Sequence, residues 1–532
     1  MIVYEFLLFS LLNLVLNTFL FFFISIAYFY SLTGYGKLLI GDNYSNNNSN
    51  FFEVPIFGLV IKIIVGFIIY IFIGTNFLIN ILLFILGLFL YFLYKKKLNK
   101  IKFYYVILLL TTVFTVLLIS KTHEDFNYYH YFSIHEVFSN NLRIGVSKLN
   151  ERFFHSSLLI YEQSLLVLPY FKFQLIHLSV FFIYFSILGY FLNILTNKNK
   201  SEEFFFSIVC VMILLIKFNR LSEFGYDYIS QFLLLIVFHK IYFLIKEKKE
   251  LVNAILFFIL SILIKPVSLL FSPIIIFLLI KHNLNFNLSL FFSRKIIFLS
   301  LIFILIFSSF FRTGCVFYPL NSTCFSKETI FWSEKNRIKD YSEYVSLWAK
   351  AYYVKEDSKY KKITDKTIFK KNFNWVKNWI NEHFFYKIFE FLLIVIFLLL
   401  LSYIYFTREK SKKKRFNKDE IYLIILSSLS IFLWFITVPQ FRFGFASMMI
   451  LSYLVFRVFL NQKILFDRKK IIHLFIFSVL ILNIKNFNRI ESEFKRDDFY
   501  KFNNFPFYNE IKINNDYSNI QRIKFLNIEI LK

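Results

Sequence analysis

The fold class follows from the N-terminal stretch MIVYEFLLFSLLNLVLNTFLFFFISIAYFY, residues 1–30, in which Glu5 is the one charged side chain. An apolar run of this length is long enough for a helix to cross a bilayer, which takes about 20 residues. The stretch lacks the basic start and the small-residue cleavage site of a secretory signal peptide. We therefore expect it to form a first transmembrane span.

Comparable apolar runs recur through the 532-residue chain, which is 58% hydrophobic with a mean hydropathy of +0.59. Because only structures that satisfy their own backbone hydrogen bonds are stable in lipid, these runs predict helices. The expected fold is an all-α polytopic integral membrane protein with about fourteen transmembrane helices and interfacial helices in its external loops. The expected spans are 4–30, 55–74, 77–94, 103–120, 174–195, 204–218, 228–245, 251–264, 266–281, 295–311, 388–406, 420–438, 444–460 and 471–484.

The net charge of +27 comes from basic residues clustered in short loops, at 95–102, 246–250, 408–418 and 467–470. This is the positive-inside pattern of a membrane protein, and it argues against a nucleic-acid partner. Placing these loops in the cytoplasm puts both termini outside. We expect a multi-pass protein of a bacterial cytoplasmic (inner) membrane.

The expected order and direction of the spans divide the chain into five parts and place its long polar loops on the external side. The parts are N-terminal spans 1–100, a core 101–311 with an external loop 121–173, an external loop 312–387, C-terminal spans 388–484 and an external tail 485–532. Within the core, the sequence ILIKPVSLL leaves open whether 251–281 is two short spans or one broken helix.

The first candidate catalytic groups are Glu124 and Asp125, in KTHEDFNYYHYFSIHE at 121–136. A carboxylate just outside a span suits a general base that deprotonates a hydroxyl, or a ligand for a hard divalent cation. Such a cation is compatible with this sequence but not required by it, and no other cofactor is indicated. The alternative is that Asp125 caps a following interfacial helix.

Arg152 lies near the end of a segment, 132–161, that we expect to lie as a helix on the membrane surface before it re-enters the membrane. Arginine holds phosphate through two parallel hydrogen bonds, so Arg152 is a candidate contact for a lipid-linked phosphate. The alternative is that Arg152 reaches lipid headgroups.

Two further candidates, Asp227 and Arg442, stand at external span ends, and Lys265, before Pro266 in the interrupted pair of spans, is a candidate of the same kind as Arg442. Acids at such positions favour a functional role, and an arginine in a tight external turn is well placed for a phosphate. The alternative for Arg442 is an interface anchor. Two charges within spans, Lys62 and Lys217, have no obvious acidic partner in the sequence.

Loop 312–387 contains two cysteines and most of the tryptophans. We expect Cys315 and Cys324 to form a disulfide, with two free thiols as the alternative, and too few soft ligands lie nearby for a zinc site. Sugars stack on tryptophan, but we favour interface anchoring for the four in this loop, Trp332, Trp348, Trp375 and Trp379.

The ordered motifs D-x-x-Y-Y-H, R-F-x-x-x-S, D-Y, I-K-P-V-S, G-C-x-x-Y-P-L and W-F-x-x-x-P-x-F-R-F-G resemble those of the GT-C-like membrane glycosyltransferases of bacteria, in a poorly characterised surface-polysaccharide branch. The resemblance covers about residues 100–460. It implies a polyprenyl-phosphate-linked sugar donor, inverting transfer and a catalytic acid that Asp125 matches, while Arg442 matches a donor-phosphate contact. More spans precede Asp125 than is usual in that family, and Glu124 competes for the same role.

The expected function is transfer of a sugar from that donor to a glycan or glycolipid acceptor, with membrane lipid around the protein. His130 joins the expected substrate-binding residues. The alternatives are an O-antigen-type polysaccharide polymerase or ligase, which would rely on arginine and not on a carboxylate, and a lipid-linked glycan transporter.

Overall fold

The structure, a computed structural model, describes residues 2–40, 48–94, 100–119, 125–154, 157–196, 201–217, 225–244, 248–281, 295–353, 365–406, 408–410, 418–459, 462–464, 467–495, 522–525 and 528–531. Glu124, one of the expected catalytic residues, lies outside this described part, as does most of the expected external tail 485–532.

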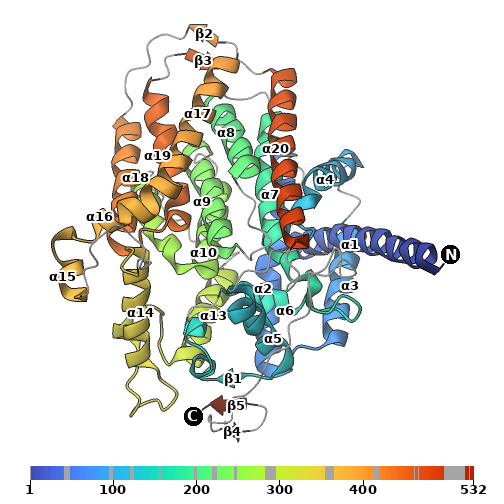
Figure 1. Ribbon diagram of the computed structural model, residues 1–532, viewed down its shortest axis with the longest axis vertical. Helices are drawn as coiled ribbons and strands as arrows, with labels where there is room; N and C mark the ends of the chain where they lie inside the picture. The colour runs from blue at the N-terminus through green and yellow to red at the C-terminus, as the bar shows by residue number, and fades with distance from the viewer. Residues whose placement is uncertain are drawn as a thin grey trace.

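Helices make up almost all of the described chain (Figure 1). The α-helices are α1 (Ile2–Ile40), α2 (Val54–Phe72), α3 (Phe77–Leu93), α4 (Lys100–Val113), α5 (Tyr131–Ser139), α6 (Leu159–Ser164), α7 (His177–Thr196), α8 (Ser201–Lys217), α9 (Tyr226–Phe243), α10 (Lys248–Ile264), α11 (Ser272–Lys281), α13 (Lys295–Thr313), α14 (Lys335–Ala349), α15 (Lys366–Lys370), α16 (Val376–Trp379), α17 (Glu390–Tyr405), α18 (Lys418–Thr437), α19 (Phe441–Phe459) and α20 (Arg468–Phe494). Short 3₁₀ or π turns that matter below are η1 (Asn48–Glu53), η4 (Phe126–His130), η6 (Glu151–Phe154), η9 (Pro266–Phe271) and η12 (Ile380–Phe389).

The prediction of a multi-pass membrane protein agrees with these helices. Within the described residues, eight helices are long and apolar enough to cross a membrane, and the apolar helices at Phe77–Leu93, Phe103–Val116, Glu250–Ile264 and Pro266–Ile276 are shorter. Each of the fourteen expected spans coincides with a helix, although fewer than fourteen have the length and composition of a span.

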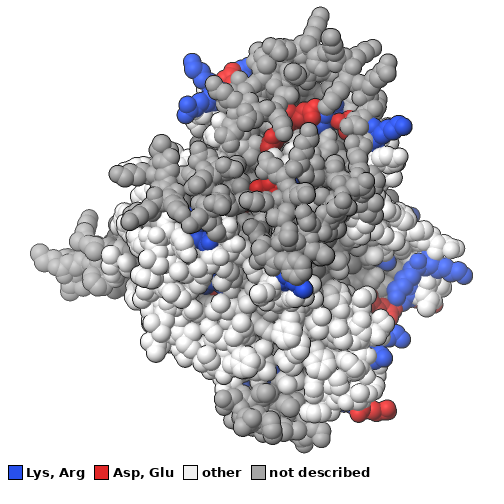
Figure 2. All heavy atoms as spheres, turned by 180° about the vertical axis from the view of Figure 1, so that it is seen from behind, with Lys and Arg blue, Asp and Glu red and all other residues white. Residues whose placement is uncertain are grey.

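The surface of the described part also fits a lipid environment. From behind, the described part is mostly uncharged, with some charged side chains over the middle of the view and others toward its margins (Figure 2). Large apolar side chains point outward, with Phe72 72%, Leu78 67% and Ile296 78% exposed. Apolar exposure on this scale is unusual in a soluble monomer.

Helix α7 lies at the centre of the molecule, with nearly every side chain buried, and packs against α2, α8 and α9 (Figure 1). Glycines allow α1 to approach its neighbours closely. A Cβ atom on Gly58 of α2 would lie 1.8 Å from the carbonyl oxygen of Leu32, and one on Gly34 would lie 2.0 Å from that of Gly87 in α3. Small residues at contacts of this kind are typical of helices packed in a membrane.

The segment 251–281, for which we expect two short spans or one broken helix, forms two helices, α10 and α11, with a break between them. The chain leaves α10 at Lys265, whose backbone is extended, and Pro266 starts the tighter turn η9. An extended residue before proline is expected, because the proline ring disfavours helical geometry there. Helix α10 packs on α9 whereas α11 packs on α18, so the two pieces have different partners.

The expectation of one surface helix over 132–161 is wrong. Helix α5 ends at Ser139, and β1 (Arg143–Ile144), the turn η6 and the short helix α6 follow. Most of α5 and all of α6 are buried. The alternation of polar and apolar residues in this segment therefore belongs to short elements that are mostly buried in the protein, and not to one helix on a membrane surface.

Strands form two small sheets near opposite ends of the molecule (Figure 1). In the first, β1 pairs in parallel with β5 (Ile528–Leu531), which pairs antiparallel with β4 (Arg522–Phe525). In the second, β2 (Arg408–Lys410) pairs with β3 (Gln462–Ile464). The first sheet joins the strand Ile528–Leu531 to the loop 121–173, so these two segments lie on the same side of the membrane.

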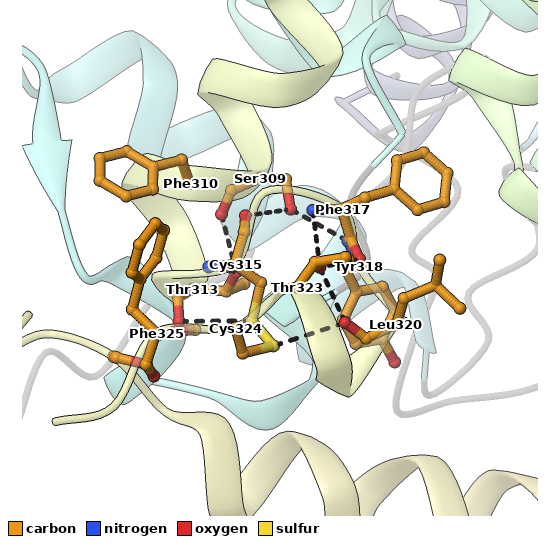
Figure 3. The surroundings of a disulfide bond; sticks show 12 residues. Ser309, Phe310, Thr313, Cys315, Phe317, Tyr318, Leu320, Thr323, Cys324 and Phe325 are labelled. Carbon is orange, nitrogen blue, oxygen red and sulfur yellow. Dashed lines mark hydrogen bonds between the residues drawn. A yellow bond between two sulfur atoms is a disulfide. The ribbon is translucent and has the colours of Figure 1, made fainter.

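Cys315 and Cys324 form the expected disulfide (Figure 3). It closes a hairpin in which Thr323 accepts a hydrogen bond from the backbone of Phe317 at 3.1 Å. The bridged pair packs in a small apolar cluster with Phe154 of η6. The disulfide therefore supports the turn that carries Arg152.

Both charges within spans have acidic partners that sequence reasoning missed. Lys62 of α2 lies 3.3 Å from Glu162 of α6, and both side chains are buried. Lys217 lies 2.6 Å from Glu390 of α17. Tyr28 of α1 also donates a hydrogen bond to Glu162, so three elements meet at this buried carboxylate.

Candidate functional site

The ends of three helices bring one acidic and two positively charged side chains together. Asp227 is in the first turn of α9, Lys265 directly follows α10, and Arg442 is in the first turn of α19. The Lys265 ammonium lies 2.9 Å from one carboxylate oxygen of Asp227, and Nε of Arg442 lies 3.0 Å from the other. The Asp227 side chain is 13% exposed, while those of Lys265 and Arg442 are 21% and 33% exposed.

Tryptophans fix the turn that leads into Arg442. Trp379 donates a hydrogen bond to the carbonyl of Pro439 at 2.6 Å, and Trp434 donates one to the carbonyl of Gln440 at 2.8 Å. Trp375 and Trp379 are buried against α18, so the expectation that they anchor the protein at the interface is wrong. Their role in this structure is to hold a backbone turn beside the site.

The charge on Asp227 is set by its two cationic neighbours. Asp227 precedes the expected span 228–245. Burial opposes its ionisation, but Lys265 and Arg442 outweigh that effect and lower the pKa of the carboxyl to about 2. A carboxylate with so low a pKa is a weak base at neutral pH, so Asp227 is suited to holding cations in place and not to accepting a proton.

The loop 121–173 covers these helix ends with Asp125, Tyr129, His130 and Arg152. The π turn η4 carries Tyr129, whose ring lies 4.0 Å from that of His130 and 5.7 Å from the Arg152 guanidinium carbon. Burial, followed by the charges of Asp125 and Asp227, raises the pKa of Tyr129 well above its usual value. Tyr129 is therefore a neutral hydroxyl at the centre of the charged groups.

Asp125 is partly exposed and lies at the start of the π turn. Its side chain makes no capping hydrogen bond, so the helix-cap alternative is wrong. It acts electrostatically on Tyr129, Arg152 and Arg442, which places it within the same cluster.

A recess of about 400 Å³, counting space open to solvent, runs between the loop and the helix ends. Its polar lining includes Tyr129, His130, Tyr226 and Lys265, and its apolar walls include Ile160 and Ile264. The phenol of Tyr226 donates a hydrogen bond to Gln163 of α6 and its ring contacts that of His130.

Trp348, near the end of α14, faces the cluster from the loop 312–387. The Arg442 guanidinium carbon lies 5.4 Å from the Trp348 ring and 5.2 Å from the Phe443 ring. Trp348 is 37% exposed, unlike the buried Trp375 and Trp379. An exposed aromatic face beside a cation can stack on a sugar ring while the cation holds a charged group.

The structure thus brings together six of the expected residues, Asp125, His130, Arg152, Asp227, Lys265 and Arg442. Sequence reasoning missed Tyr129 and Tyr226, and it passed over Trp348 in favour of anchoring. The motif around Asp125 contained Tyr129, but nothing in it distinguished that tyrosine from Tyr128 and Tyr131. Among the described residues, no group of three or more His, Cys, Asp or Glu side chains is arranged to hold a metal ion.

The chain belongs to the family described as a domain of unknown function (DUF8201), which matches residues 18–449. No curated protein and no solved structure shows a significant match to it. The matched region contains all six of the clustered residues.

Proposed function

We propose that this protein is a membrane glycosyltransferase that moves a sugar from a polyprenyl-phosphate donor to a glycan or glycolipid acceptor at the outer face of the cytoplasmic membrane. The observation that carries the proposal is the charged cluster at the ends of apolar helices, where Arg152, Lys265 and Arg442 lie with the acids Asp125 and Asp227. Lys265 also lines the recess beside this cluster. A lipid phosphate and a sugar hydroxyl need these two kinds of group side by side.

The cations suit the donor phosphate. Three positive and two negative side chains leave the cluster with net positive charge, which favours an anionic ligand. Arg442 and Lys265 are already oriented by Asp227, so little reorganisation is needed when negative charge develops on the departing phosphate. The neutral hydroxyl of Tyr129 adds a donor between them.

Asp125 is the base in this mechanism. The acceptor hydroxyl loses its proton to Asp125, its oxygen bonds to the anomeric carbon, and the bond from that carbon to the phosphate oxygen breaks. Polyprenyl phosphate leaves with the electron pair, and the proton stays on Asp125 until solvent removes it. Asp227 cannot take this role while Lys265 and Arg442 hold its pKa near 2.

The test is sugar transfer in membranes, from radiolabelled polyprenyl-phosphate monosaccharides, by the wild type and by Asp125→Asn. Loss of a positioned general base lowers the rate by about 100- to 10,000-fold. Asp340→Asn is the matched control, because Asp340 is an exposed acid of α14 in the other external loop. Equal transfer by the Asp125→Asn and wild-type proteins, at equal protein levels, would refute the role of Asp125.

A binding measurement separates donor recognition from chemistry. Purified protein should bind polyprenyl phosphate, the leaving group, and Arg442→Gln should weaken that binding by about tenfold or more, the usual effect of losing a charged hydrogen bond. Arg337→Gln should not change it, because Arg337, whose side chain is 41% exposed and pairs with Glu334, lies on α14 outside the cluster. Transfer of lipid-linked oligosaccharide that survives Asp125→Asn but not Arg442→Gln would instead favour the polymerase.

A further inference from the structure

Gln440 joins the external loop 312–387 to the turn before α19. Its side-chain amide nitrogen donates to the carbonyl of Ala349 at 3.2 Å and lies 2.9 Å from Nε2 of His383 in η12. Ala349 is the last residue of α14 and directly follows Trp348, and Gln440 itself is 5% exposed. The transfer proposed above uses neither Gln440 nor His383.

The direction of these two hydrogen bonds follows from the Ala349 carbonyl. A carbonyl oxygen accepts and never donates, so the nitrogen and not the oxygen of the Gln440 amide faces it. The same nitrogen faces His383, so Nε2 of His383 is the acceptor, and this imidazole is neutral with its proton on Nδ1. The contact therefore requires a donor on residue 440 and an acceptor on residue 383, and not only side chains of the right size.

The carbonyl that Gln440 binds lies at the C-terminal end of α14. The last four carbonyls of a helix have no partner within that helix, so a donor from outside can fix its end. Trp348 precedes Ala349 by one residue, and its ring lies 5.4 Å from the guanidinium carbon of Arg442. The hydrogen bond from Gln440 thus holds the backbone from which Trp348 reaches Arg442.

Arg442 is held by contacts that do not involve the Gln440 side chain. Trp434 donates to the backbone carbonyl of Gln440 at 2.8 Å, and Nε of Arg442 lies 3.0 Å from the Asp227 carboxylate. Both contacts remain when the side chain of Gln440 is replaced. Such a replacement therefore releases the end of α14 and leaves the arginine beside its carboxylate.

We propose that Gln440, with His383 as its acceptor, is a positioning residue through which the site binds a sugar-bearing donor more tightly than bare polyprenyl phosphate. The inference rests on the transferase function proposed above, in which Arg442 binds the donor phosphate. The two side chains hold Trp348 beside Arg442, so an aromatic surface lies next to the phosphate, where the sugar begins. Trp348 is 37% exposed, which leaves part of its ring for a sugar to stack on. The external loop thus supplies recognition of the sugar, while the helix ends supply recognition of the phosphate.

The test compares the binding of two ligands to the full-length protein, polyprenyl phosphate and the polyprenyl-phosphate monosaccharide that the wild type transfers. Gln440→Met keeps the volume of the side chain and removes its donor. It should weaken binding of the sugar-bearing lipid by about two- to fivefold, the loss expected for Trp348→Ala, and leave binding of polyprenyl phosphate unchanged. The matched control is Gln231→Met, because Gln231 is 1% exposed and accepts a hydrogen bond from the backbone of Ala446 at 3.2 Å, within the helices. This control should not change the ratio of the two affinities.

Double variants separate positioning from a general structural role. In a protein that already carries Trp348→Ala, Gln440→Met should have no further effect on donor binding, because the group that Gln440 positions is gone. His383→Gln, which keeps an acceptor in reach of the amide, should retain the preference for the sugar-bearing lipid, whereas His383→Met should lose it. Additive effects of Gln440→Met and Trp348→Ala, or equal weakening of both ligands by Gln440→Met, overturn the inference.

The fluorescence of Trp348 gives a readout that needs no ligand. Its emission is the difference between the spectra of the protein and of its Trp348→Phe variant, and quenching of that emission by acrylamide should increase in Gln440→Met. Unchanged quenching overturns the inference and leaves the proposed function standing if the wild type binds both lipids. Failure of the wild type to bind either lipid refutes the proposed function and the donor preference with it, whatever the quenching shows.

Discussion

Replacing Asp227 with asparagine tests the electrostatic core of the candidate site. The fall of its pKa from 3.8 to about 2 corresponds to about 2–3 kcal/mol, since one pH unit corresponds to about 1.4 kcal/mol. That is the net balance between burial, which opposes the charge, and Lys265 with Arg442, which favour it. We therefore expect Asp227→Asn to lower the free energy of unfolding at pH 7 by about 2–3 kcal/mol.

The effect has a defined pH dependence. The folded carboxyl has a lower pKa than the unfolded one, so its stabilisation is fully present above about pH 5 and is lost as the pH falls toward 2. About half of the difference between the wild type and Asp227→Asn should remain at pH 3. A group stabilised in its protonated form would show the opposite trend.

The measurement is unfolding by sodium dodecyl sulfate in mixed micelles, followed by tryptophan fluorescence, from pH 7 to pH 3. The matched control is Glu343→Gln, which removes an ion pair of 2.6 Å with Lys370 whose side chains are both 39% exposed. Exposed pairs contribute little, so this change should stay within about 0.5 kcal/mol. Equal effects of the two substitutions, or a difference that does not change with pH, would refute the electrostatic account of Asp227.

Three further predictions concern parts of the structure around the site. Lys62→Met should lower the free energy of unfolding by about 3–5 kcal/mol, because it leaves the Glu162 carboxylate charged and buried. The double variant Lys62→Met with Glu162→Gln should recover most of that loss, and a double variant no more stable than the single one would contradict this explanation. Cys315→Ser with Cys324→Ser should cost about 2–3 kcal/mol in an unfolding titration, as expected for a bridge between residues nine apart, and dithiothreitol should reproduce the loss in the wild type alone. Trp348→Ala should weaken polyprenyl-phosphate-sugar binding by about two- to fivefold, through the lost contact with Arg442, whereas Trp332→Ala should not change it in a direct binding assay.

The positions of the helices could be predicted from the sequence because lipid demands long apolar runs and places basic loops on one side. The same rule explains why Asp227 and Arg442 could be expected on one side of the membrane. Each borders a span whose direction the basic loops define, whereas Lys265 lies in a segment for which two topologies fitted the sequence. Their contact through one carboxylate could not be derived, because hydropathy gives the level of a residue in the membrane and not which helices are neighbours.

Tyr129 shows a different limit. Three tyrosines stand within four residues at 128–131, and which one faces the charged groups depends on the π turn η4. One extra residue per turn rotates every following side chain, so a regular helical pattern assigns the wrong face. The helix-cap alternative for Asp125 failed for a related reason, since the chain there is already helical before the turn begins.

The error about the segment 132–161 has a physical cause. A polar side chain on a short helix indicates a surface only if no partner is available in the interior. Glu162 has Lys62 and Tyr28, and Glu136 has Arg143, so both carboxylates are buried at sites where the sequence alone predicts exposure. The partners come from α1, α2 and β1, and two of these lie far from α6 in the sequence. The burial of polar residues in this loop is therefore decided by pairs formed across the fold, which the local sequence does not show.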